Sequence, residues 1–173
     1  MGEKTGLVVA IACIFIGILG LLFTGVFQYR FYGMMGETYR KSSYTSNGER
    51  IYYTATNDSG QRIHFSVGPS WLYMIGGSCV NCHGVNGKGG VPVMMSSKVA
   101  PDITYQSLIS GKHKHGDEHE NEAPYTDDLI KRAITNGIDA SGHPLDKSMP
   151  RFKISEKDLN DLLGYLRSLG IHD

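Results

Sequence analysis

The chain opens with a long apolar stretch that no charged residue interrupts. Residues 6–27 read GLVVAIACIFIGILGLLFTGVF. As a helix rising about 1.5 Å per residue, this stretch would be about 33 Å long, enough to cross a bilayer core of about 30 Å. Aromatic and basic side chains follow at 28–32, as at a membrane interface. The pattern predicts an uncleaved transmembrane helix rather than a signal peptide, because no small-residue cleavage site follows it.

A period of two replaces this pattern between residues 51 and 67. Apolar and polar side chains alternate over 51–55 and again over 63–67, which is typical of half-buried strands. The turn-forming sequence Asn-Asp-Ser-Gly lies between them at 57–60. We therefore expect a short β-hairpin on a tether that begins at residue 28. A lone hairpin is marginal in water, so it should pack against another part of the chain or a partner.

Beyond residue 69 the apolar positions recur every three or four residues, which is the helical period. Capping and stopping residues mark the ends of the predicted helices. These helices are a short one after Ser70 over 71–75, another over 105–109 before Gly111, one from Thr126 to Asn136-Gly137, and a last one from Ser155 to Gly170. The apolar face of the last helix consists of Leu159, Leu162, Leu163, Leu166 and Leu169.

The candidate chemistry lies in Cys79-Val80-Asn81-Cys82-His83. A Cys-x-x-Cys-His run is typical of covalent attachment of c-type haem. Two thiols three residues apart on one helical turn can bond one edge of the porphyrin, and the next residue then directs its imidazole at the iron. The sequence therefore predicts one covalent haem c, attached through Cys79 and Cys82 and ligated by His83.

Other uses of a Cys-x-x-Cys pair fit this chain less well. A structural zinc site needs four ligands, and the one further cysteine, Cys13, lies inside the apolar stretch. A thioredoxin-like redox pair needs a buried strand before it, whereas Gly76-Gly77-Ser78 precedes this one. A plain disulfide is the third alternative.

The net charge and the remaining histidines add little to the functional prediction. Lysine plus arginine equals aspartate plus glutamate at 17 each, so the sequence does not indicate a nucleic-acid partner. His113, His115 and His119 lie in an acidic run, KHKHGDEHENEAP, for which we expect a solvated loop rather than a metal site.

Over roughly residues 70–170, the haem motif, the glycine-rich loop after it, a middle helix, Met149-Pro150 and the leucine-rich last helix resemble a class I cytochrome c. The resemblance implies an all-α domain around one haem, in which the first and last helices cross. The crossing often places a small residue of the first helix against an aromatic residue of the last. Tyr165 is a candidate for the aromatic residue, and Gly76 or Gly77 for the small one.

The fold class expected for the whole chain is thus an all-α class I cytochrome c domain with an N-terminal transmembrane helix and a short β-hairpin extension. Its predicted parts are a tail over 1–5, the anchor over 6–27, the tether and hairpin over 28–68, and the haem domain over 69–173.

The resemblance also implies the remaining haem contacts. Met149, before Pro150, matches the distal ligand of the iron, with Met94, Met95 and the histidines of 113–119 as rivals. Pro101 matches the residue whose carbonyl accepts the second ring N–H of the proximal histidine, with Pro92 as the alternative. Arg151 is a candidate partner for a haem propionate or a surface residue.

We expect a membrane-anchored mono-haem electron carrier, not an enzyme by itself. The expected location is the cytoplasmic (inner) membrane, crossed once, with the haem domain on the periplasmic side. The expected partners are the lipid bilayer and either redox proteins or subunits of a respiratory membrane complex, as in the cytochrome c subunit of bacterial nitric oxide reductases. The alternatives are a five-coordinate haem enzyme or gas sensor, and a structural subunit whose haem is off the electron path.

Overall fold

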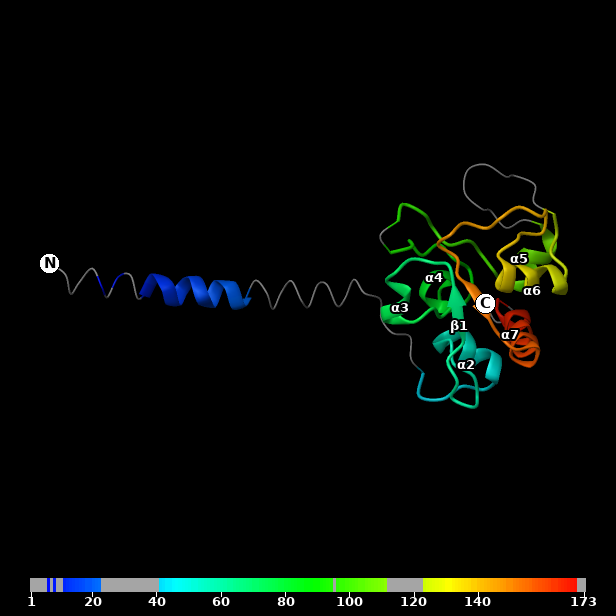
Figure 1. Ribbon diagram of the computed structural model, residues 1–173, viewed down its shortest axis with the longest axis horizontal. Helices are drawn as coiled ribbons and strands as arrows, with labels where there is room; N and C mark the ends of the chain where they lie inside the picture. The colour runs from blue at the N-terminus through cyan, green and yellow to red at the C-terminus, as the bar shows by residue number, and fades with distance from the viewer. Residues whose placement is uncertain are drawn as a thin grey trace. The chain divides into compact units, whose positions relative to one another are not determined.

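A computed structural model describes residues 6, 8, 11–22, 41–94, 96–111 and 123–170 of the chain. The chain divides into two compact units, Met1–Glu37 and Thr38–Asp173. The first contains a helical stretch over 11–22 whose side chains are exposed. The second contains all the other helices and both strands of the described residues, coloured cyan to red in Figure 1.

The transmembrane prediction for residues 6–27 is wrong by this structure. Within the described part of the chain, no helix combines the length and the apolar character that crossing a bilayer requires. The expected N-terminal transmembrane helix and the single-pass location in the inner membrane are therefore both corrected.

The second unit is mainly helical and carries one two-stranded sheet (Figure 1). Its helices are α2 (Asn47–Thr54), α3 (Leu72–Ile75), α4 (Val80–His83), α5 (Tyr105–Ser110), α6 (Asp127–Asn136) and α7 (Glu156–Ser168). Its strands are β1 (His64–Ser66) and β2 (Arg151–Lys153), which pair antiparallel. The caps predicted at Thr126 and Ser155 are confirmed, since each hydroxyl accepts a backbone N–H three residues later.

The predicted hairpin is wrong in its first half, because α2 occupies those residues. The hydroxyl of Ser46 caps the helix by accepting from the Glu49 backbone N–H at 3.1 Å. Ile51 and Tyr52 face the core one turn after Gly48, so the helical period fits this segment as well as the period of two does. The sequence Ser-Asn-Gly-Glu at 46–49 is a capping-box pattern, which is the signal for this helix.

The second predicted strand forms, but its partner is distant in the sequence. Phe65 of β1 lies opposite Phe152 of β2. The predicted turn at 57–60 is bracketed by an isolated bridge between Thr56 and Arg62. The segment 55–78 therefore leaves α2, makes this turn, pairs with β2 and returns to the haem motif.

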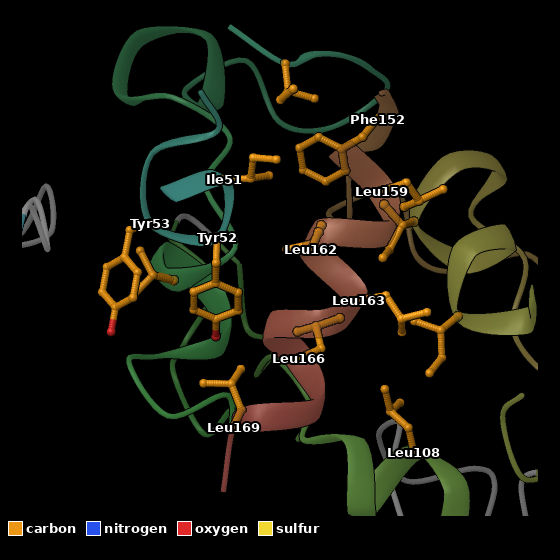
Figure 2. Packing of buried hydrophobic residues seen from close by; sticks show 14 of the residues in the cluster. Ile51, Tyr52, Tyr53, Leu108, Phe152, Leu159, Leu162, Leu163, Leu166 and Leu169 are labelled. Atoms are coloured by element: carbon orange, nitrogen blue, oxygen red, sulfur yellow. The ribbon is translucent and has the colours of Figure 1, made fainter. Parts of the chain in front are cut away.

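The core of the second unit lies between α2 and α7. Tyr52 is fully buried, and its ring centroid lies 5.3 Å from that of Tyr165 on α7. Figure 2 shows Ile51 and Tyr52 facing the row of leucines on α7. Gly48 allows this approach, because a Cβ built there would lie 1.9 Å from the backbone oxygen of Asp161. The small residue at the crossing is thus Gly48, and neither Gly76 nor Gly77.

The crossing predicts the effect of adding one methyl group at position 48. We expect Gly48→Ala to lower the free energy of unfolding by about 2–3 kcal/mol or more, because the obstructing atom is backbone and cannot rotate away. Gly164→Ala on α7 is the matched control, since its Cβ would meet nothing within 4 Å. The control should be neutral or stabilising by about 0.5–1 kcal/mol in denaturant titrations. Equal stabilities for the two variants would contradict the crossing.

Candidate haem site

The two motif cysteines lie at the start of α4. Cys79 is the N-cap of that helix, and the backbone N–H of His83 donates to its carbonyl at 2.9 Å. Both cysteines are free thiols, and Cys79 packs against the core. Burial raises the pKa of the Cys79 thiol to about 12, and it raises that of Cys82 as well. The two sulfur-bearing side chains therefore lie three residues apart, within one helical turn.

His83 is buried, with 5% of its surface exposed, and its ring has a fixed orientation. Nδ1 lies 2.9 Å from the carbonyl oxygen of Pro101. A carbonyl only accepts hydrogen bonds, so Nδ1 carries the proton, and in the neutral ring the lone pair is then on Nε2. Such a bond fixes the tautomer and raises the basicity of a metal-binding imidazole. The acceptor expected from the sequence, Pro101, is the residue in place, while Pro92 forms an isolated bridge with Val99.

The loop between His83 and Pro101 is folded tightly back on itself. The backbone N–H of Gly89 donates to His83 O at 3.0 Å, and that of Gly90 donates to Ala100 O at 3.0 Å. Gly89 has a φ of +68°, and a Cβ there would lie 2.4 Å from both Ala100 O and Pro101 O. Only glycine allows the loop to approach the carbonyl that orients His83.

Two tyrosines of α2 hold the other end of this loop. Tyr52 Oη donates to Gly84 O at 2.7 Å, and Tyr53 Oη lies 3.2 Å from Val85 O as a longer bond. Burial and the nearby Cys79 raise the pKa of Tyr52 above its usual range, so it remains a donor. The helix that the sequence analysis missed thus fixes the residue directly after the candidate iron ligand.

Met149 lies on a separate loop that runs from the end of α6 to β2. It is partly buried and packs against the core. Its backbone N–H donates to Asp146 O at 3.1 Å, and that of Ser148 donates to the Asp146 carboxylate at 2.8 Å. Lys98, from the loop after the haem motif, pairs with Asp146 and is the main cause that lowers the pKa of that carboxyl to about 2. This ion pair joins the loop after His83 to the loop before Met149.

The segment 55–78 contacts both halves of the site. The amide of Asn81, inside the haem motif, donates to Gly76 O at 3.2 Å. A Cβ built at Gly68 would lie 3.7 Å from the Cβ of Pro150, next to Met149. Together with the β1–β2 pairing, these contacts place the segment beside both the attachment motif and the loop that contains Met149.

Arg151 was a candidate for a haem propionate, and its guanidinium donates to backbone carbonyls of the Met149 loop. The propionate pairing stays a prediction. Among the rival ligands, Met94 is partly buried, whereas Met95 and the histidines of 113–119 lie outside the described residues.

The donor set fits a covalently attached haem. It offers two thiols with the spacing of the attachment motif and an imidazole whose Nε2 carries the lone pair.

Comparison with known protein families matches residues 72–170 to the family described as Cytochrome c. The match covers more than half of the chain, and the chain belongs to this family. Its domain carries covalently attached haem c, and such domains are in general carriers of electrons rather than enzymes. No curated protein and no solved structure matched the chain.

The family match begins after α2, so it omits the helix that packs on α7. A strand was predicted where this helix lies, so the roles of Gly48, Tyr52 and Tyr53 were not predicted either. The capping-box pattern at 46–49 was the available signal.

The folded loop predicts different effects at two neighbouring glycines. Gly89→Ala should lower the free energy of unfolding by about 2–4 kcal/mol, because the new Cβ meets the backbone at Ala100 and Pro101. Gly90 also has a positive φ, +75°, but a Cβ there meets nothing within 4 Å, so Gly90→Ala should cost only about 1 kcal/mol. Thermal or denaturant unfolding measures both. Equal losses of stability in the two variants would show that position 89 does not require glycine for its close approach to the backbone of Ala100 and Pro101.

Proposed function

We propose that the chain carries single electrons through one haem c, attached to Cys79 and Cys82 and ligated by His83 and Met149. The observation that carries this proposal is the buried His83 ring, oriented by Pro101 O at 2.9 Å, directly after two free thiols. The iron of the bound haem supplies a one-electron change of oxidation state. The chain's own residues hold the group, orient the imidazole and limit access of water.

The proposed distal ligand is a neutral thioether, which favours reduced iron relative to a second imidazole or a thiolate. Met149 is suited to this role because several contacts fix its loop. Its backbone N–H donates to Asp146 O, its side chain packs against the core, and β2, which follows it, pairs with β1. If His83 and Met149 both held the iron of the bound haem, neither side of it would be open to a substrate, which favours an electron carrier over an enzyme or a gas sensor.

The proposed partners are other redox proteins. The sequence resemblance indicates a respiratory complex among them, which the chain would serve as an electron donor or as a subunit. Encounters of this kind are usually small and transient. Val85, which follows the haem motif by two residues, and Tyr73 and Met74 of α3 are exposed, so apolar surface is available close to the motif in sequence.

The distal ligand is tested by Met149→Ala, with Met94→Ala as the matched control. We expect Met149→Ala to abolish the weak sulfur-to-iron absorption at the red end of the ferric spectrum, and Met94→Ala to retain it. The Met149 variant should also bind carbon monoxide rapidly when reduced, because one axial position has become open. Persistence of the red absorption in Met149→Ala would refute the assignment, and rapid binding by the unaltered protein would favour the enzyme or sensor alternative.

The covalent attachment is tested by Cys82→Ser. This variant should lose most or all of its covalent haem, which a haem-stained denaturing gel measures, because one of the two thioether bonds is no longer possible. Cys13→Ser is the control, since Cys13 is an exposed thiol outside the motif, and it should stain at full strength. Full staining of Cys82→Ser would count against attachment at this site.

A further inference from the structure

Arg151 lies two residues beyond Met149, at the start of β2, and its guanidinium turns back towards the loop that precedes it. Nη2 donates to Leu145 O at 2.7 Å, and Nη1 donates to Met149 O. Asp146 O lies 3.4 Å from Nη1 and 3.5 Å from Nη2. One side chain thus contacts the carbonyls at the beginning and at the end of the segment 145–149.

The other side of the guanidinium packs on the end of α6. Gly137 is the C-cap of that helix, with a φ of +65°. A Cβ built there would lie 1.5 Å from Arg151 Nε and 1.9 Å from Cζ, so the arginine fills the space that glycine leaves. The loop closes around this point, since the backbone N–H of Leu145 donates to Gly137 O at 2.8 Å.

We propose that Arg151 is a positioning residue for Met149, given that Met149 ligates the iron as proposed above. A guanidinium presents five N–H donors in a rigid fork, so it fixes several carbonyls in one geometry. A thioether is a weak ligand that competes with water and with added bases, and its occupancy of the iron depends on how firmly the loop presents it. Without the guanidinium, the carbonyls of Leu145 and Met149 lose their shared donor and the loop can move away.

This role differs in its consequences from the propionate pairing expected from the sequence. A propionate partner changes the reduction potential but leaves the competition for the distal position of the iron unaltered. A positioning residue changes that competition directly. Titration of the ferric protein with imidazole, followed at the red sulfur-to-iron absorption, separates the two roles.

The primary variant is Arg151→Met in the full chain with haem attached, which keeps an unbranched side chain and removes all its hydrogen-bond donors. We expect imidazole to displace the thioether at a concentration at least tenfold lower than in the unaltered protein. Arg151→Lys, with its single ammonium, should lie in between. Lys153→Met is the control, because Lys153 is an exposed residue of the same strand and should leave the imidazole affinity unchanged.

A second pair of variants approaches the same contact from α6 with the arginine intact. Gly137→Ala should push the guanidinium away and raise the imidazole affinity as Arg151→Met does. Gly142→Ala is its control in the same loop, since it has a φ of +94° but its Cβ would meet nothing within 4 Å. A merely structural effect would lower the stability of both glycine variants and leave both imidazole affinities unchanged.

The outcomes separate this inference from the proposed function. If the unaltered protein lacks the sulfur-to-iron absorption, Met149 is not the ligand, and the proposed function fails with it. If the absorption is present but Arg151→Met and Gly137→Ala bind imidazole as the unaltered protein does, the positioning role is overturned while the ligand assignment stands. Should Arg151→Met take up no haem, the same imidazole titration is made with Arg151→Lys and Gly137→Ala. Imidazole affinities above that of the unaltered protein support the positioning role, and unchanged affinities overturn it.

Discussion

The close approach of α2 and α7 at Gly48 is the constraint on which the rest of the haem domain depends. Because no side chain separates the two backbones there, Tyr52 can bury its ring against Tyr165 and still reach the carbonyl of Gly84 with its hydroxyl. That hydroxyl is the direct link between the helical core and the residue after His83. The packing of α2 on α7 thus fixes the backbone next to His83, the candidate iron ligand.

Local signals in the sequence account for much of the site. The attachment motif needs only five consecutive residues, and the proline acceptor for His83 follows from the family resemblance; the structure places Pro101 O within hydrogen-bonding distance of that ring. Helix ends at Thr126 and Ser155 were predictable because a capping hydroxyl acts within three residues. The ligation by Met149 rests on the same resemblance and remains a prediction.

Features set by distant contacts could not be predicted in this way. Residues 51–55 fit a strand and a helix equally well, and the burial that decides between them comes from α7, more than a hundred residues later. β1 was expected to pair with that segment, but its partner is β2, beyond Met149. The apolar run at 6–27 was long enough for a bilayer by composition, whereas no helix among the described residues is long and apolar enough to cross one.

The segment between α2 and the attachment motif joins two parts of the site. Residues 55–78 separate α2 from the attachment motif, and they contact both Asn81 and the stretch around Pro150. The proximal and distal sides are joined a second time by the ion pair of Lys98 with Asp146. A displacement of either loop would break contacts with the other.

In the proposed site, the thioether of Met149 and the imidazole of His83 hold the iron of the haem. Proton NMR of the reduced protein with labelled methionine methyl groups tests it most directly, because the ring current of the haem shifts a bound thioether methyl strongly. Of the seven methionines in the chain, we predict that one methyl signal lies far upfield of the others and is absent from a Met149 variant. Seven methyl signals within the ordinary range would contradict the account.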